Sequence, residues 1–281
     1  MKYLLGSPKD FHDFIDSIPK EGKVGILTHT DVDGIVSGIF LKKILKSRGI
    51  SSSFVEFLQY GSGVLEEFSK RRNYDFLILT DWNADNFPEG LGMLREKGKV
   101  LVVDHHPIND LLEKKEGIIK TDSTYCSSHA LFDLANEGNY FDTKNFELLV
   151  CSAIIMDYTF GDKKVFEFLR EIYPKISKEE IFESVPGKIG KEIDNALIYY
   201  RDDLKRVFDI VYERNFDSLE KVAGIVEIEI ENKIKEYKRE AEYFPTKGLY
   251  FYFFNPTFSI TSPVINKVSH SDPEKIFILA S

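Results

Sequence analysis

Four short apolar runs separated by segments of helical periodicity restrict the fold of this chain more than any other feature. Each run is rich in Val, Ile and Leu, long enough for a buried strand and too short for a typical helix. The runs are residues 23–28, 53–58, 75–80 and 99–103. Strands and helices that alternate at these lengths require right-handed crossovers. We therefore predict an α/β fold with a doubly wound, mostly parallel sheet, in which ligands bind at the carboxyl ends of the strands.

The segments between these runs have the pattern of amphipathic helices. Residues 35–46 place apolar side chains at helical spacing with lysines on the other face, and Gly49 follows as a stop signal. Similar helices are expected at residues 64–72 and 91–97. After Thr121 the pattern becomes mainly helical. The helical segments expected there are residues 127–137, 143–156, 163–172, 188–212 and 216–243.

The last part of the sequence predicts two further strands. They are the apolar runs 248–254 and 275–280, and the segment 255–267 between them contains two prolines. A strand at the end of the sequence would have little to pair with. We therefore expect a helical layer, a charged connector helix at 224–245, and the truncated start of a second α/β domain at 246–281.

Composition excludes several classes of protein. The formal net charge of −9 means that nucleic-acid binding cannot be inferred from overall charge, so such a substrate would need basic patches, metal ions or a partner. Cys126 and Cys151 are the only cysteines and lack metal-site spacing, which excludes a disulfide scaffold and a zinc finger. The sequence shows no signal peptide and no apolar run of membrane-spanning length. We expect a soluble cytoplasmic protein that does not associate with membranes.

The first predicted strand leads directly into a group of potential metal ligands, His29, Asp31 and Asp33. In an extended segment, residues two apart point the same way, so these three side chains could converge on one point. Such ligands suit a divalent cation. The alternative is that Asp33 caps the following helix and Asp31 is solvated.

Two later strands end in similar residues. Asp81 follows the third strand, and Asp104, His105 and His106 follow the fourth. An imidazole that binds a metal usually needs a carboxylate to fix its tautomer, so an aspartate before two histidines is informative. A solvated turn before Pro107 is the alternative.

A further candidate lies in the helical region. Asp157 ends an otherwise apolar helix, where the helix dipole disfavours a negative charge. A metal ion would supply the missing positive charge, and an ordinary surface aspartate is the alternative.

Taken together and in this order, these segments resemble the DHH phosphoesterase superfamily. The resemblance covers roughly the first two-thirds of the chain, and residues 123–130 are similar to the Ser/Thr-rich helix start of that family. Within the superfamily, the first motif is more similar to that of the archaeal RecJ-like single-strand exonuclease branch than to that of the oligoribonuclease and nucleotide-phosphatase branch. Residues 260–269 also resemble the opening of a DHH-associated, substrate-binding domain. The implied division is a DHH domain at 1–223, the connector and the second domain.

The resemblance implies a two-metal site that contains Mn²⁺, with Mg²⁺ as the alternative ion. It assigns His29, Asp31 and Asp81 to one ion. It assigns Asp33, Asp81, His105 and Asp157 to the other, so that Asp81 bridges. Two cations that share a carboxylate lower the pKa of an attacking water. The catalytic roles go to His106, which would contact phosphoryl oxygens, and Asp104, which would orient a neighbouring histidine.

Three functions remain open from the sequence. The first is metal-dependent exonuclease activity on single-stranded DNA or RNA. The second uses the same site on short oligonucleotides, nucleoside bisphosphates or cyclic dinucleotides, which the acidic net charge favours. The third is a non-catalytic DHH module that binds replication or repair proteins. The polarity of digestion and the oligomeric state cannot be derived from the sequence.

Overall fold

The computed structural model describes residues 1–110, 112–113, 115–270, 272 and 274–281. The chain forms two compact units, Met1–Lys191 (unit 1) and Glu192–Ser281 (unit 2). The break lies earlier than the boundary at residue 223 expected from the sequence. The reason is that Ile198 packs into the same apolar cluster as Val226 and Tyr252 of unit 2. The assignment of residues 246–281 to a DHH-associated domain stays a prediction.

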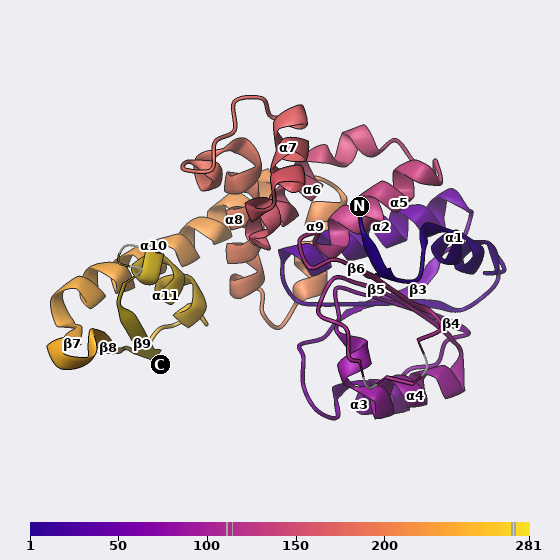
Figure 1. Cartoon of the computed structure of the whole chain (residues 1–281), viewed down its shortest axis with the longest axis horizontal. Helices are drawn as coiled ribbons and strands as arrows, with labels where there is room; N and C mark the ends of the chain where they lie inside the picture. Colours follow the sequence, from indigo (N-terminus) through magenta and orange to yellow (C-terminus); the bar gives the residue numbers. More distant parts are fainter. Residues whose placement is uncertain (111, 114, 271, 273) are drawn as a thin grey trace. The chain divides into compact units, whose positions relative to one another are not determined.

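Unit 1 is built on a six-stranded, mostly parallel sheet (Figure 1). Its strands are β1 (Tyr3–Leu5), β2 (Val24–Thr28), β3 (Ser52–Phe57), β4 (Phe76–Thr80), β5 (Lys99–Asp104) and β6 (Ile118–Thr121). Their order across the sheet is β1-β6-β5-β4-β2-β3, and only the β1–β6 pair is antiparallel. The predicted α/β fold class with a mostly parallel sheet is therefore confirmed.

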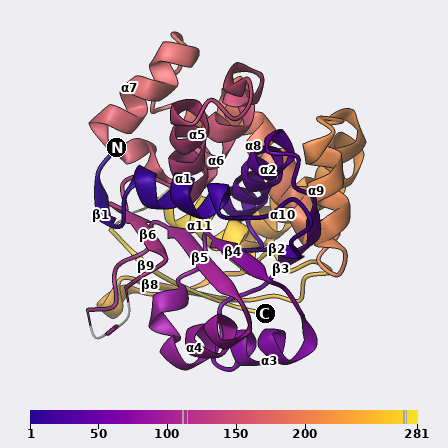
Figure 2. The same ribbon diagram turned by 90° about the vertical axis from the view of Figure 1, so that its right-hand side faces the viewer.

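Helices cover both faces of this sheet. In Figures 1 and 2, α3 (Val64–Arg71) and α4 (Pro88–Lys97) lie on one face. The other face carries α1 (Pro8–Asp16), α2 (Val32–Ser47) and α5 (Ser127–Glu137). Alternate strand residues such as Leu77 and Leu79 pack with Leu65 and Leu91 in one buried cluster. Burial on both faces explains why the central strands are continuous apolar runs.

The helical part of unit 1 follows the sequence-based expectation with two differences. The helix expected from residue 143 begins as a 3-10 turn, Thr143–Phe146, before α6 (Glu147–Met156). Next come α7 (Lys163–Ile172) and α8 (Val185–Tyr199). The helix expected at 188–212 is broken after α8, and α9 (Leu204–Tyr212) starts anew with Asp203 as its cap. Among the described residues, no helix combines the length and hydrophobicity needed to cross a bilayer.

Unit 2 contains the second half of α8, all of α9, a small sheet and two further helices. After the long α10 (Asp217–Glu240) come β7 (Glu242–Phe244), β8 (Leu249–Phe253), α11 (Thr261–His270) and β9 (Ile276–Ala280). The expectation that the last strand would have little to pair with was wrong, because β9 pairs in parallel with β8. The crossover between them is α11, which the sequence analysis missed. Its proline, Pro263, lies in the first turn, where proline is tolerated.

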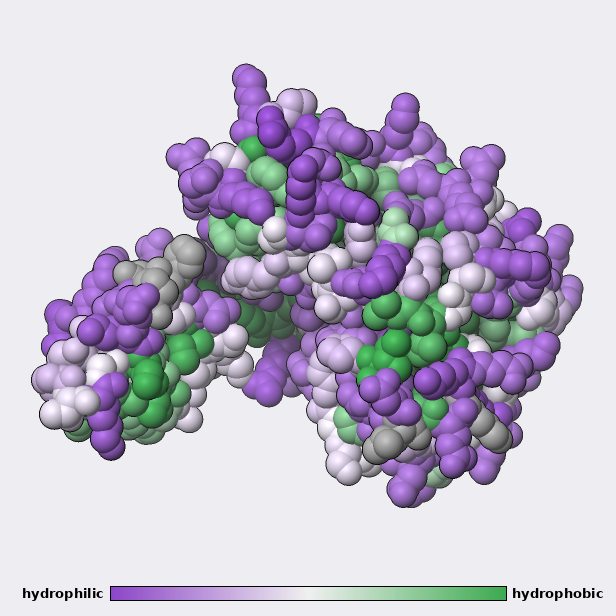
Figure 3. All heavy atoms as spheres, in the orientation of Figure 1, coloured by the Kyte–Doolittle hydropathy of each residue, from purple (hydrophilic) through white to green (hydrophobic). Residues whose placement is uncertain are grey.

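The outward side of this small sheet is apolar. Phe253 is 66% exposed and Ile276 is 55% exposed. The surface of unit 2 in Figure 3 shows a group of green, hydrophobic residues among purple, hydrophilic ones. Nothing among the described residues of unit 2 covers these side chains, so exposed apolar area is a property of this unit.

Candidate metal centre

Three neighbouring strands bring the candidate ligands to one edge of the large sheet. β2, β4 and β5 are adjacent and parallel, so their carboxyl ends meet. His29 follows β2, Asp81 follows β4, and His105 follows β5. The topology thus places at one edge the residues that the sequence separates by up to 76 positions, from 29 to 105.

The loop after β2 contributes His29 and Asp31. The Nδ1 atom of His29 lies 2.8 Å from Oδ2 of Asp31. Asp31 is also the N-cap of α2, and its Oδ1 accepts the backbone N–H of Gly34 at 2.9 Å. The alternative in which Asp33 caps this helix was therefore wrong, because the helix starts one residue after Asp31.

Asp33 lies in the first turn of α2 and not in an extended segment, so the argument from alternating side chains does not hold for it. Its carboxylate points to the start of α5 instead. There Oδ2 accepts the backbone N–H of Ser127 at 2.8 Å, and Oδ1 accepts that of Ser128 at 2.9 Å. A negative charge at a helix N-terminus is stabilised by the helix dipole. A role for Asp33 as a metal ligand stays a prediction.

Asp81 lies between the other candidates. Its Oδ1 is 3.5 Å from Nε2 of His105, and its Oδ2 is 3.9 Å from Nδ1 of His29. The side chain is 2% exposed. Its backbone has a φ of +52°, a left-handed conformation that few residues other than glycine adopt without strain. Asp tolerates this conformation better than most residues, because its short side chain can hydrogen-bond locally.

Among the described residues, two groups offer ligand atoms that all lie within 4.8 Å of one another. One group is His29, Asp31 and Asp81, and the other is Asp81, Asp104, His105 and His106. Asp81 belongs to both. Asp33 and Asp157 belong to neither, although Oδ2 of Asp157 lies 3.9 Å from Nε2 of His105. The geometry therefore brings most of the predicted ligands together around Asp81.

The candidate centre has more negative than positive charge. Burial, together with the charges of Asp31, Asp33, Asp104 and Asp157, raises the pKa of Asp81 well above its usual value. Burial and neighbouring carboxylates raise the pKa of Asp157 to about 9. In the described part of the chain, the ion pairs of Asp81 and Asp157 are with histidines alone.

The buried polar atoms of this centre fit divalent cations. Hydrogen-bond partners are missing, within the described residues, for Nε2 of His29, Oδ2 of Asp81, both ring nitrogens of His105 and Oδ2 of Asp157. Such atoms are rare in folded proteins, since each loses its interaction with water. Burial also lowers the pKa of His105, which favours the neutral ring and leaves the lone pair of one nitrogen available to a metal. Lone pairs and excess negative charge at one point are what a cation requires.

His106 is held on both sides of its ring. Its Nδ1 lies 2.8 Å from Oδ1 of the buried Asp104, and its Nε2 lies 3.3 Å from the hydroxyl of Tyr60. Burial lowers the pKa of His106, but the hydrogen bond to Asp104 and the charges of Asp104 and Asp33 together outweigh it, so the net shift is upward. The predicted proximity of Asp104 to a histidine is thus present in the structure.

Sequence reasoning missed two residues at this edge. Tyr60 stacks on His29 with ring centroids 4.3 Å apart, and its hydroxyl donates to the backbone oxygen of Asp81 at 3.0 Å. Lys120 in β6 is fully buried and pairs with Asp85 and Asp104. A lysine within the short apolar run at 118–121 was the available signal for the second residue. No signal in the sequence pointed to Tyr60.

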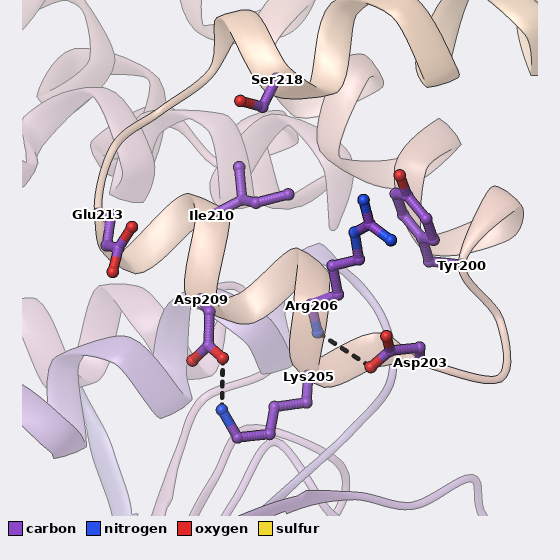
Figure 4. Close-up of a pocket in the computed structure, with 8 residues that line it drawn as sticks. All are labelled: Tyr200, Asp203, Lys205, Arg206, Asp209, Ile210, Glu213 and Ser218. Atoms are coloured by element: carbon purple, nitrogen blue, oxygen red, sulfur yellow. Dashed lines mark hydrogen bonds and ion pairs between the residues drawn. The ribbon is translucent and has the colours of Figure 1, made fainter.

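A buried histidine, the two cysteines and a surface pocket lie outside the candidate centre. His129 is buried and stacks on Phe168 at 4.5 Å between centroids, and burial lowers its pKa to about 4. Both cysteines are buried and free, as expected. A pocket in unit 2 is lined by polar side chains from α9 and its flanks (Figure 4). There Lys205 pairs with Asp209, Asp203 accepts the backbone N–H of Arg206, and the guanidinium of Arg206 lies over the ring of Tyr200.

Comparison with known proteins finds a family match over the part of the chain that carries all the candidate ligands except Asp157. Residues 23–154 match the model of the DHH family, N-terminal domain. No curated protein matches the sequence at a significant level.

Solved structures match over almost the whole chain. An exonuclease RecJ bound to manganese matches with a TM-score of 0.73 and 12% identity, over 98% of this chain and 80% of the other. RecJ from Thermus thermophilus in complex with Mn²⁺ matches with a TM-score of 0.72 and 13% identity, over 97% of this chain and 45% of the other. CDC45 from Entamoeba histolytica matches with a TM-score of 0.63 and 12% identity, over 98% of this chain and 86% of the other. The chain thus spans less than half the length of the Thermus protein, and these identities establish similarity of fold.

Proposed function

Because residues 23–154 match the DHH family model and the chain has a RecJ-like fold, we propose that it is a metal-dependent phosphoesterase that removes nucleotides from single-stranded DNA or RNA. The observation that carries this proposal is the set of buried nitrogen and oxygen atoms without partners around Asp81. Mixed histidine and carboxylate ligands favour Mn²⁺, with Mg²⁺ as the alternative ion.

The proposed ligand sets share Asp81. His29 and Asp31 would complete one set, as their common grouping with Asp81 supports. The other set is Asp33, Asp81, His105 and Asp157. When bound, a pair of divalent cations acidifies an attacking water and neutralises the charge that develops on phosphoryl oxygens. Asp33 can serve while it accepts its two backbone N–H groups, since a carboxylate has further lone pairs.

His106 and Asp104 are proposed to act on the substrate side. The side chain of His106 is 30% exposed, so a phosphate can reach it, whereas that of Asp104 is fully buried. Asp104 accepts Nδ1–H of His106 and thereby fixes the orientation of the ring. The carboxylate of Asp104 also favours the doubly protonated imidazolium. In that form His106 can donate Nε2–H to a phosphoryl oxygen, in competition with its 3.3 Å contact to Tyr60.

The direct test is product analysis with Mn²⁺ present. End-labelled single-stranded DNA, RNA and dinucleotides are incubated with the protein and with two variants, Asp81→Ala and Asp75→Ala. Asp75 is the matched control, because it precedes β4 whereas Asp81 follows the same strand. We expect release of nucleotides by the parent and by Asp75→Ala but not by Asp81→Ala. Equal products with all three proteins would contradict the proposal.

The same assay separates the proposal from its two alternatives. Activity confined to dinucleotides or cyclic dinucleotides would favour the small-substrate function, which the net charge of −9 supports. Absence of hydrolysis and of bound Mn²⁺ at micromolar concentration would favour a non-catalytic module that binds replication or repair proteins. The fold shared with CDC45 is the observation that keeps this module as a candidate. The buried polar atoms without partners argue against it, because a binding module has no need for them.

A further inference from the structure

Lys120 is the only lysine or arginine with a buried side chain among the described residues, and it lies outside the proposed ligand sets. It lies in β6 with no exposed surface. Its Nζ atom lies 2.6 Å from Oδ1 of Asp85 and 2.9 Å from Oδ2 of Asp104. Oδ1 of Asn83 is 2.8 Å away. The backbone oxygens of His106 and Pro107 lie at 3.1 and 3.2 Å. A buried ammonium group is tolerated only with such compensation.

These oxygen atoms come from two loops that also carry candidate ligands. Asn83 and Asp85 belong to the loop that follows Asp81. The other contacts belong to the segment that contains His105. Lys120 therefore cross-links the two loops from a third strand. A second link runs from Asn109 to Asp85, whose Oδ2 accepts the backbone N–H of Asn109 at 2.8 Å.

The contact with Asp104 extends to His106. One carboxylate oxygen of Asp104 faces Lys120, and the other accepts Nδ1–H of His106 at 2.8 Å. Asp104 is thus fixed in two directions, and it has no exposed side-chain surface through which water could replace either partner. The chain of contacts continues from His106 to Tyr60, which stacks on His29.

We propose that Lys120 is a positioning residue, which holds Asp104 in place and thereby fixes the imidazole of His106 beside the candidate metal centre. This inference rests on the proposed hydrolytic function for its consequence in turnover. The geometric part, which is the hold on His106, does not depend on that function. The simpler alternative is that Lys120 only stabilises the sheet edge and has no effect on the ring.

The first experiment measures the position of His106 without metal or substrate. The imidazole NMR signals of His106, assigned with His106→Asn, are compared in the parent, Lys120→Met and Lys99→Met. Lys99 is the matched control, because it is an exposed lysine at the opposite end of the neighbouring strand β5. We expect the signals to shift and broaden in Lys120→Met alone. Unchanged signals in a folded Lys120→Met protein would overturn the inference.

The second experiment measures turnover of a chromogenic phosphodiester with Mn²⁺. In Lys120→Met we expect kcat to fall by about 10- to 100-fold, with KM and Mn²⁺ affinity within about threefold of the parent. Because the effect is transmitted through Asp104, adding Lys120→Met to Asp104→Asn should lower kcat by less than about threefold more. Independent, multiplying losses in the double variant would mean that Lys120 does not act through Asp104.

Two provisions keep these outcomes interpretable. Lys120→Met leaves two buried carboxylates without their cation, so the same measurements are made on Lys120→Met/Asp85→Asn, which loses one charge of each sign. If this charge-balanced variant has normal His106 signals and normal kcat, the inference is overturned. If the parent protein hydrolyses no substrate, the proposed function fails, and the NMR comparison alone then decides whether Lys120 positions His106.

Discussion

Two buried charged clusters lie at the same edge of the large sheet and differ in how their charges are balanced. In the lysine cluster, Lys120 faces two carboxylates and three further oxygen atoms. In the cluster around Asp81, carboxylates face histidines, and several buried atoms have no partner within the described chain. The carboxylates of the first cluster have a lysine as their counter-ion. Under the proposed function, those of the second would be neutralised by cations from solution, so the two clusters give opposite expectations for substitution of their charged residues.

The largest expected effect concerns the shared ligand. Asp81→Ala should lower hydrolysis by about a thousandfold or more, because it removes a ligand of both ions and their stabilisation of developing charge. It should also abolish binding of both Mn²⁺ ions, which isothermal titration calorimetry measures. Near-normal activity and metal binding would remove Asp81 from the site, and Asp75→Ala, at the other end of the same strand, is the control.

A stability measurement separates the two clusters next. Lys120→Met should lower the free energy of unfolding by about 3–5 kcal/mol, because buried carboxylates lose their cation. Asp81→Asn should instead raise the stability of the metal-free protein, because it removes a carboxylate whose pKa burial has raised. Denaturant unfolding in the presence of a chelator checks both changes. Destabilisation by both substitutions would show that the clusters do not differ in the way described.

Asp104 pairs with Lys120 and also contacts His106. Its substitution therefore shows how the lysine cluster affects the candidate metal centre. Asp104→Asn should retain bound Mn²⁺ and lower kcat by about 10- to 100-fold, because an orienting carboxylate affects the reaction through its histidine. Steady-state kinetics and metal analysis of the same preparation provide the measurement. Loss of metal would make Asp104 a direct ligand, as its presence in one of the two ligand groups allows.

The smallest effect concerns Asp133 in α5, a half-buried carboxylate outside both clusters. Burial raises its pKa from 3.8 to about 6, so the folded state holds a proton that the unfolded state releases. Its stabilising contribution is complete below about pH 4 and is lost as the pH rises to about 6. Asp133→Asn should therefore raise stability by about 1–2 kcal/mol at pH 8 and by little at pH 4. Equal changes in the free energy of unfolding at both pH values would contradict this origin.

The sequence predicted the central strands of unit 1 well, because β2 and β4 are buried on both faces and are therefore continuous apolar runs. It missed β1 and β6. β1 is only three residues long, and the charged Lys120 interrupts the apolar pattern of β6. Short strands at the side of a sheet depend on their neighbours more than on their own sequence.

The sequence predicted which residues the fold brings to this sheet edge where a strand ends in a charged residue, as at Asp81 and Asp104. The orientation of Asp33 was not, because it depends on the N-terminus of α5, more than 90 residues further along the chain. Tyr60 was missed for the same reason, since its place over His29 follows from the neighbouring strands β2 and β3. The sequence also did not show that the last two strands pair through α11.

The left-handed backbone conformation of Asp81 limits which residues can replace it without strain. Asparagine is the other residue with a side chain that accepts this conformation readily, and it has nearly the same shape as aspartate. Replacement of one carboxylate oxygen by an amide nitrogen would remove the shared negative charge and leave the backbone undisturbed. If the proposed function holds, this single replacement would remove activity without loss of the architecture. In a lineage where it occurred, the residue at position 81 would distinguish an enzyme from a scaffold that uses the same surface for binding.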